Sequence, residues 1–260
     1  MTCRIFVDDS PDHLERGIPR GSLTIPGKWL FRHEGTEIEL TMPERDPIYD
    51  MGYHSQRHAH LIGEDEYFWA RAEASARLYF SPEERSKRIF EYGCGIGQGI
   101  ASLPNASGWD VSSEAREICL RRNIAVYDDI NMVPRKAWDI VLCRHVLEHL
   151  ESPLEHLKLM RELIAEHGEL LIVLPREQHE SASFTPDLNQ HLYCWNFRAI
   201  NNLLGRAGLR PHTNRYAYVL GYRVLLPVRR ILGADAYFYA TQIVGYLKRN
   251  GELIVRAKVK

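Results

Sequence analysis

Residues 91–99 read Glu91-Tyr92-Gly93-Cys94-Gly95-Ile96-Gly97-Gln98-Gly99. Glycine therefore occupies every second position from 93 to 99. The apolar residues Ile89 and Phe90 come just before, which predicts a short strand over residues 89–92 that runs into a glycine-rich turn. Because glycine has no Cβ, such a turn lets a ligand come close to the backbone. The stretch predicts a nucleotide-type binding loop.

The spacing of these glycines excludes two common nucleotide loops. A dinucleotide fingerprint needs glycines at relative positions 1, 3 and 6. Counted from Gly93 the sixth position is Gln98, and counted from Gly95 it is Ile100. No Lys-Ser or Lys-Thr pair follows the loop, so the phosphate loop of NTPases is absent as well. A nicotinamide-dependent oxidoreductase is therefore the disfavoured interpretation.

Short strands and helices alternate after the loop. We expect strands at residues 109–111, 125–127, 138–143, 169–174 and 253–259. A helix capped by Ser112 or Ser113, a second that ends at Gly168 and a third capped by Asn196 lie between them. This alternation predicts an α/β fold, in which a mostly parallel sheet carries helices on both faces.

The chain divides into two expected parts. Residues 1–80 form an N-terminal extension and lid, with a hairpin over residues 28–40 that turns at Glu34-Gly35 and a helix over residues 64–79. Residues 81–260 form the ligand-binding domain, with an insertion at about 216–250. In the extension, His54, His58 and His60 are expected to be a solvated surface cluster rather than part of a pocket.

The acid-x-Gly-x-Gly-x-Gly pattern of residues 91–97 resembles the first motif of the class I S-adenosylmethionine-dependent methyltransferases. The resemblance extends over residues 88–175, and includes the segment WDIVLCRHVLEHL at 138–150 with its His-Val-Leu-Glu-His run. It is strongest to bacterial members that act on small molecules or glycans. It implies a Rossmann-like, seven-stranded, mostly parallel sheet whose last strand is antiparallel. It also implies S-adenosylmethionine as cofactor and S-adenosylhomocysteine as product.

The same resemblance assigns residues to the cofactor. An acid at the end of the second strand accepts two hydrogen bonds from the ribose, and Asp110 stands at that place; either Asp128 or Asp129 lies near the adenine. The implied cofactor-binding residues are Glu91, Gly93, Gly95, Gly97, Asp110, Val111, Asp129, Ile130, Cys143 and Arg144. Only twelve residues separate Gly97 from Asp110, where a dinucleotide fold has about 20. This spacing predicts a shortened helix and second strand.

The catalytic candidates follow the fourth strand. His145, Glu148 and His149 are spaced i, i+3, i+4, which predicts that a helix presents them on one face. A histidine near its ordinary pKa is a suitable base for a hydroxyl, so His149 and His145 are the candidate catalytic residues. The Asn/Asp-Pro-Pro-aromatic motif of amine methylation is missing after Cys143. We therefore expect O-methylation of a small molecule, a glycan or a lipid-linked acceptor.

Two alternatives stay open. A subset of the family that acts on RNA ends or quinone precursors carries a Glu-x-x-Glu-His motif and a later histidine that bind a divalent metal. Here His145 replaces the first Glu and His191 could be the later ligand, so no metal ligand is assigned. The five cysteines include no CxxC pair, which argues against structural zinc. The second alternative is a non-catalytic protein that binds S-adenosylmethionine.

Composition restricts partners and compartment. The formal net charge is -1, so no global basic field attracts nucleic acid. No apolar run reaches the roughly 18 residues of a membrane span, and charges at Asp8 and Asp9 interrupt any signal peptide, so a cytoplasmic location is expected. Aromatic residues and arginines interleave over residues 216–250. This pattern suits an amphiphilic acceptor, a peripheral membrane contact or a homodimer contact.

Overall fold

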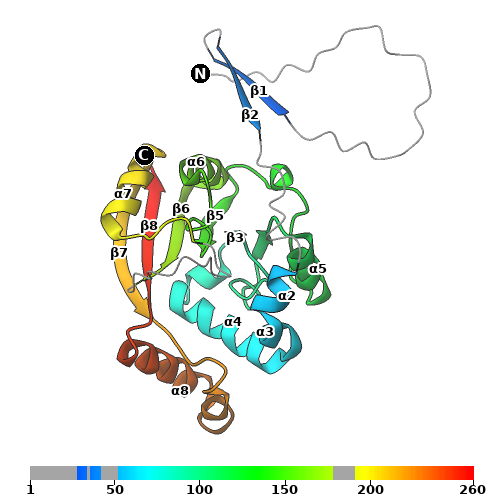
Figure 1. Cartoon of the computed structure of the whole chain (residues 1–260), viewed down its shortest axis with the longest axis vertical. Helices are drawn as coiled ribbons and strands as arrows, with labels where there is room; N and C mark the ends of the chain where they lie inside the picture. Colours follow the sequence, from blue (N-terminus) through cyan, green and yellow to red (C-terminus); the bar gives the residue numbers. More distant parts are fainter. Residues whose placement is uncertain (1–27, 34–35, 42–51, 178–190) are drawn as a thin grey trace, which may run out of the picture. The chain divides into compact units, whose positions relative to one another are not determined.

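The computed structural model describes residues 28–33, 36–41, 52–177 and 191–260, and the chain forms two compact units, Met1–Glu44 and Arg45–Lys260 (Figure 1). In the first unit, β1 (Lys28–His33) pairs antiparallel with β2 (Thr36–Thr41), which confirms the predicted hairpin. Its expected turn at residues 34–35 lies outside the described residues. The assignment of residues 1–80 as a lid stays a prediction.

A six-stranded sheet dominates the described part of the second unit, with strand order β4-β3-β5-β6-β8-β7. Its strands are β3 (Ile89–Tyr92), β4 (Ala106–Trp109), β5 (Trp138–Arg144), β6 (Ile164–Pro175), β7 (Leu209–Tyr218) and β8 (Gly251–Val259). The pairs β3–β4, β3–β5 and β5–β6 are parallel, whereas β8 is antiparallel to both neighbours. The mostly parallel sheet with an antiparallel last strand is therefore confirmed.

The prediction of a seventh strand, at residues 125–127, is wrong. Residues 125–127 make a single bridge, between Val126 and Gly108, because the neighbouring β4 is only four residues long. The second strand ends at Trp109, so the expected strand at residues 109–111 is displaced toward the N-terminus. Residues 98–103 form turns and no helix. The short spacing between Gly97 and Asp110 accounts for both shortened elements.

Two of the predicted helix starts have the expected caps. The Ser112 hydroxyl accepts a hydrogen bond from Ala115 N (3.2 Å) at the start of α5 (Ser113–Arg121), and Asn196 Oδ1 accepts one from Ala199 N (2.9 Å) at the start of α7 (Phe197–Arg206). The helix α6 (Pro153–Leu163) ends before Gly168, which lies inside β6, so the expected stop at Gly168 is wrong. A Cβ on Gly168 would lie 2.6 Å from the Trp138 carbonyl oxygen. Close strand packing explains this glycine.

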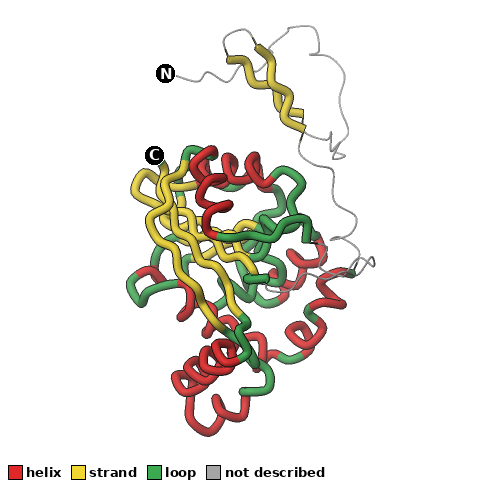
Figure 2. Tube along the Cα trace, turned by 60° about the vertical axis from the view of Figure 1, so that its left-hand side comes forward, coloured by secondary structure: helices red, strands yellow, loops and turns green. Residues whose placement is uncertain are grey.

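Helices cover both faces of the sheet (Figure 2). The side chains of Ile140 and Leu142 share one hydrophobic cluster with Phe68 of α4 (Asp65–Tyr79) and Ile118 of α5. Side chains alternate along a strand, so the buried Val141 faces the other side, where α6 packs on β5 and β6 and α7 on β7 and β8. Shorter elements complete the unit: α2 (Tyr53–Arg57), α3 (Ala59–Gly63) and the 3-10 turns Glu84–Ser86 and Ile130–Met132.

The segment between β7 and β8 forms α8 (Leu226–Leu247), with a break in helical geometry at Gly233. It packs on α4 through a cluster of Ala70, Ala74, Leu226 and Tyr237. Pairs Pro175–Glu252 and Tyr218–Gly251 show that β6 and β7 end where β8 begins. The segment that contains α8 therefore leaves the sheet at the carboxyl end of the parallel strands. None of the helices among the described residues is both long enough and apolar enough to cross a membrane.

We predict that Gly97→Ala destabilises the protein by about 1–3 kcal/mol. Gly97 has φ of 83°, and a Cβ there would lie 2.7 Å from Ile124 Cδ1 and 3.1 Å from Cys119 Sγ. Gly205→Ala is the control, because Gly205 lies in α7 with nothing within 4 Å of its Cβ position, and it should be neutral or slightly stabilising. Urea unfolding measures both. Equal stability of the two variants would contradict the steric argument.

Candidate cofactor and acceptor site

The glycine loop begins where β3 ends, at the carboxyl edge of the sheet. Gly93, Gly95 and Gly97 all have left-handed backbone angles, with φ of 71°, 53° and 83°. Gly99 is required for a different reason, because a Cβ there would lie 2.4 Å from Glu91 Oε2. The loop therefore folds back onto the strand that precedes it and presents backbone without side chains. This is a cradle that a nucleoside-containing ligand can approach.

Asp110 directly follows β4 and is buried, with 6% of its surface exposed. Its Oδ2 accepts a hydrogen bond from Gly95 N (2.7 Å) and its Oδ1 accepts one from Ser112 N (2.9 Å). An ionised carboxylate has about four acceptor positions, so two are left for further donors. Asp110 thus binds the glycine loop and can still accept hydrogen bonds from the two hydroxyls of a ribose. This fits the role that the sequence predicts for it.

Glu91 and Arg144 form a buried ion pair beneath the loop. Arg144 Nε lies 3.1 Å from Glu91 Oε1, and both side chains are almost fully inaccessible. Burial raises the pKa of Glu91 to about 7, against the opposing effect of the Arg144 charge. The pair joins the ends of β3 and β5, which are neighbours in the sheet. Cys143, which precedes Arg144, is also buried, and burial raises the pKa of its thiol.

The residues assigned to the adenine side are on the segments that follow β4 and the Val126 bridge. Val111 is partly exposed and Ile130 is buried. The Asp129 carboxylate accepts hydrogen bonds from the backbone and side-chain nitrogens of Asn131 (both 2.9 Å), and so caps a 3-10 turn. The exposed Asp128 lies 3.9 Å from Arg116 Nε. Asp129 is therefore held in place by its own turn, whereas Asp128 faces solvent.

The segment after β5 is not helical, so the expected single helical face of His145, Glu148 and His149 is wrong. His145 has a φ of 54°, and residues 147–149 form a turn. His145 N donates to Val173 O (2.9 Å), which continues the pairing of β5 with β6 for one more residue. The helix starts only at Pro153. Sheet pairing at residue 145 therefore overrides the helical spacing of the sequence.

His145 lies between two carboxylates. Its Nε2 is 3.0 Å from Glu252 Oε1 and its Nδ1 is 3.4 Å from Glu148 Oε1. Burial lowers the pKa of His145, but hydrogen bonds to Glu148 and Glu252 outweigh it and raise the pKa to about 9. The Tyr79 hydroxyl donates to the second oxygen of Glu252 (2.8 Å). His145 is therefore a cation at neutral pH, which favours His149 over His145 as a general base.

The tertiary structure brings His149 next to His191, with ring centroids 4.7 Å apart. One ligand atom each of Glu148, His149 and His191 lies within 4.8 Å of the others. Glu148 is fully buried, and its Oε1 lies 3.4 Å from His145 Nδ1. His191 Nδ1 also contacts Glu177. The three side chains could act on a proton or hold a divalent cation.

Two features of the site were not predicted. Glu252 lies more than a hundred residues from His145 and joins it only because β8 pairs with β6. His54 was expected on the surface, but it is 6% exposed and packs on the glycine loop, so that expectation is wrong. A lone histidine on a five-residue helix carries no sequence signal of this kind.

We predict that protein stability falls as the pH rises from 6.5 to 9, and that His145→Gln removes part of this fall. With a folded-state pKa of about 9, His145 keeps a proton that the unfolded chain releases near 6.5. Its stabilising contribution is therefore complete below pH 6.5 and lost as the pH passes 9. Urea unfolding at several pH values measures the slope for the wild type and the variant.

His58→Gln is the matched control. Burial and the neighbouring His54 lower the pKa of His58 to about 3, so it costs stability only as the pH falls below 6.5. The variant should alter the slope between pH 3 and 6.5 and leave the slope above 6.5 unchanged. An identical slope for the wild type and His145→Gln between pH 6.5 and 9 would show that the two carboxylates do not hold the His145 proton.

A family of methyltransferase domains matches residues 61–214 in sequence, which is more than half of the chain. This range includes the glycine loop, Asp110 and the segment from Arg144 to His149. Among curated proteins, none matches the chain.

Solved structures share the fold at low identity. A phosphoethanolamine N-methyltransferase 2 from Haemonchus contortus, with phosphomonomethylethanolamine and S-adenosylhomocysteine, is 14% identical with a TM-score of 0.52 over 86% of this chain. This chain spans 62% of the length of that protein. An S-adenosylmethionine-dependent methyltransferase from Thermotoga maritima has a TM-score of 0.51 and 14% identity, over 84% of this chain and 100% of the other.

A third similar structure is the 1,6-didemethyltoxoflavin-N1-methyltransferase of Burkholderia thailandensis, with its substrate and S-adenosylhomocysteine bound. It is 16% identical, with a TM-score of 0.50, over 80% of this chain and 84% of the other. At these identities the likeness shows the fold alone. Together with the sequence match over residues 61–214, they show that the chain belongs to the class I S-adenosylmethionine-dependent methyltransferases.

Proposed function

We propose that the chain transfers a methyl group from S-adenosylmethionine to an oxygen of a small molecule, a glycan or a lipid-linked acceptor, with His149 as the general base. One observation carries the proposal. The glycine loop, Asp110 and the segment from Arg144 to His149 follow the adjacent strands β3, β4 and β5 at the same edge of the sheet. Ligands of open parallel sheets bind at this edge, so a donor site and a base are neighbours there.

The residues divide the work of methyl transfer. S-adenosylmethionine supplies a methyl group on a sulfonium, ready for in-line displacement. Asp110 and the glycine loop would hold its nucleoside, and the pair Glu91–Arg144 fixes the two loops relative to each other. His149 would accept the hydroxyl proton of the acceptor. The main contribution of the protein is to align the two reactants and exclude water.

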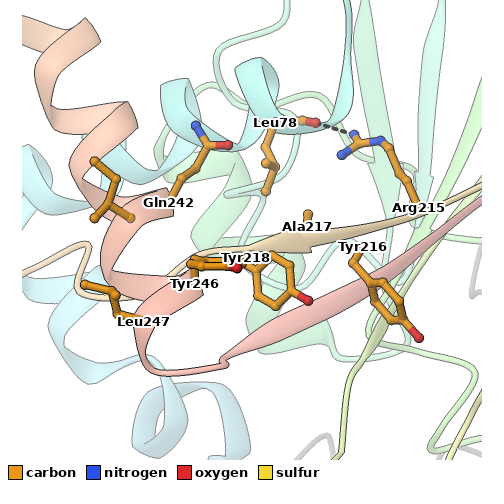
Figure 3. Close-up of a pocket in the computed structure, with 9 residues that line it drawn as sticks. Leu78, Arg215, Tyr216, Ala217, Tyr218, Gln242, Tyr246 and Leu247 are labelled. Carbon is orange, nitrogen blue, oxygen red and sulfur yellow. Dashed lines mark hydrogen bonds between the residues drawn. The ribbon is translucent and has the colours of Figure 1, made fainter.

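A groove along the edge strand β7, between this strand and α8, supports an amphiphilic acceptor (Figure 3). It has a volume of about 370 Å³ and is lined by Leu78, Arg215, Tyr216, Ala217, Tyr218, Gln242, Ile243, Tyr246 and Leu247. The lining is mostly apolar and aromatic, with a single charged group, Arg215, whose guanidinium donates to Leu78 O (2.6 Å). Three of the lining residues, Ile243, Tyr246 and Leu247, are exposed residues of α8.

The groove cannot itself be the place of methyl transfer. It lies against β7, and the glycine loop follows β3, which is four strand intervals away in the order β4-β3-β5-β6-β8-β7. At about 4.8 Å per interval this separation is roughly 19 Å. We propose that only the distal, apolar part of a long acceptor would use the groove. The same surface is our candidate for the membrane or homodimer contact at residues 216–250.

We predict that His149→Asn lowers kcat by about 10²- to 10⁴-fold, because a missing general base costs that much in proton transfer. The affinity for S-adenosylhomocysteine should change less than twofold, since the base acts on the acceptor. Rates are measured with a panel of phenolic, sugar and lipid-linked hydroxyl acceptors, and affinity by calorimetric titration. His167→Asn is the control, because His167 lies in β6, away from the loop.

Three outcomes would contradict this function. An unchanged kcat in His149→Asn would show that His149 is not the general base. Binding of NADH in place of S-adenosylhomocysteine would contradict the assignment of S-adenosylmethionine as the cofactor. Binding of S-adenosylhomocysteine without turnover of any acceptor would favour the alternative of a non-catalytic binding protein.

The convergence of Glu148, His149 and His191 favours one second candidate, a divalent-metal-assisted methyltransferase acting on RNA or quinone precursors. A carboxylate and two imidazoles form a mixed donor set that divalent transition metals accept. In that case His149 would be a ligand, and the metal would polarise the acceptor oxygen in place of a base.

We predict for this candidate that EDTA abolishes activity and that Mg²⁺, Mn²⁺ or Zn²⁺ restores it. His191→Gln should then weaken binding of the metal, measured by calorimetry, by 10-fold or more, because it removes one of three ligands. His212→Gln serves as the control, since the His212 imidazole pairs with Glu169 and lies outside the three-residue cluster. Full activity in EDTA would exclude the metal-assisted mechanism and leave His149 as the base.

A further inference from the structure

His54 lies on α2 and packs against the glycine loop. Only 6% of its surface is exposed. Its Cε1 lies 3.5 Å from the point where a Cβ of Gly95 would stand. Its Nε2 is 3.8 Å from Asp110 Oδ1, which is too long for a hydrogen bond. The imidazole thus covers the loop beside the carboxylate assigned to the ribose.

Two buried polar atoms converge on Gly95 without a partner. His54 Nδ1 and Gln98 Oε1 are both inaccessible, and neither has a hydrogen bond within the described part of the chain. They lie 3.8 Å and 3.9 Å from the Cβ position of Gly95. A buried imidazole or amide without a partner is destabilising. The other ring nitrogen of His54, Nε2, lies 3.8 Å from Asp110 Oδ1, which is beyond hydrogen-bond distance.

The position of His54 is set by contacts outside the site. The Ser55 hydroxyl on α2 donates to Glu114 of α5. Arg122, which follows α5, donates to the carbonyl oxygens of Leu61 and Ile62 in α3 (2.8 Å and 2.9 Å). The His58 ring stacks on His54 with centroids 5.6 Å apart. The helices α2 and α3 are thereby fastened to the element that follows Asp110, and Figure 1 shows α2 next to α5.

We propose that His54 is a cofactor-contacting residue, which completes the ribose pocket of an adenosyl ligand together with Asp110. This rests on the proposed function. A ribose hydroxyl can donate to Asp110 and accept from an imidazole N–H at once, because a hydroxyl is both a donor and an acceptor. Such a hydroxyl bridges two groups that are 3.8 Å apart and cannot bond directly. The helix α2 is then part of the cofactor site, although it precedes the glycine loop by more than 30 residues.

The test compares two ligands that share the ribose. S-adenosylhomocysteine carries an amino-acid end, and 5′-methylthioadenosine does not. His54→Ala should weaken both by a similar factor, roughly tenfold, as expected for one lost hydrogen bond in a buried site. His60→Ala is the matched control, because the His60 side chain is 65% exposed on the adjacent helix, and both dissociation constants should stay within twofold of the wild type. Asp110→Asn gives a reference value for the loss of ligand affinity in the same pocket.

A second readout does not depend on affinity alone. In the wild type, 5′-methylthioadenosine should protect the amides of residues 54–58 from hydrogen exchange, and His54→Ala should lose this protection at saturating ligand. Thermal unfolding without ligand establishes that the variant is folded. If His54→Ala is unfolded, His54→Gln is used instead. It should bind both ligands more weakly than the wild type, because the amide does not present the imidazole N–H at the same place, and wild-type dissociation constants for both ligands would overturn the assignment.

The outcomes separate the two proposals. Unchanged dissociation constants in folded His54→Ala, with tight binding by the wild type, would overturn the assignment of His54 and leave the methyltransferase function intact. A loss for S-adenosylhomocysteine alone would place His54 at the amino-acid end and overturn the ribose contact. Failure of the wild type to bind either adenosyl ligand would overturn the proposed function, and the role of His54 with it.

Discussion

The buried ion pair between Glu91 and Arg144 is the interaction on which the rest of the site depends. Two charges without access to water are tolerated only when each is held close to the other, and removal of one partner from such a pair typically costs about 3–5 kcal/mol. The pair joins the ends of β3 and β5, and Gly99 must lack a Cβ to leave room for the Glu91 carboxylate. The glycine loop and the catalytic segment are thereby held in one arrangement.

The same ionic network continues into the segment that follows β5. Beyond Arg144, His145 lies between Glu148 and Glu252, and Tyr79 of α4 donates to Glu252. A protonated His145 balances two buried carboxylates, so its role in the structure is that of a cation. The two neighbouring histidines therefore differ in their surroundings: His145 is an ion-paired cation, whereas His149 lies beside His191. Sequence spacing alone treats the two as equivalent.

Predictions from local sequence succeeded where one short segment decides the structure. Three kinds of feature depend only on neighbouring residues and were predicted correctly. They are the caps Ser112 and Asn196, the hairpin of β1 and β2, and the strand that leads into the glycine loop. Predictions failed where contacts with a segment distant in the sequence decide the local conformation. Pairing with Val173 displaces the expected helix at His145, and the four-residue β4 leaves the expected strand at Val126 with a single bridge. His54 was misplaced for the same reason, since its burial depends on contacts with α5 and the glycine loop.

The type of ligand site could be predicted from sequence, because the spacing of Glu91, Gly93, Gly95 and Gly97 is a local backbone requirement and Asp110 follows at the next strand end. The sequence also determined the α/β alternation, which depends on hydrophobic periodicity. Only the tertiary structure decided which charges neutralise each other, which histidine is held as a cation and which helix covers the loop. These depend on pairs such as His145–Glu252 and His54–Asp110, whose members meet only when the sheet has formed.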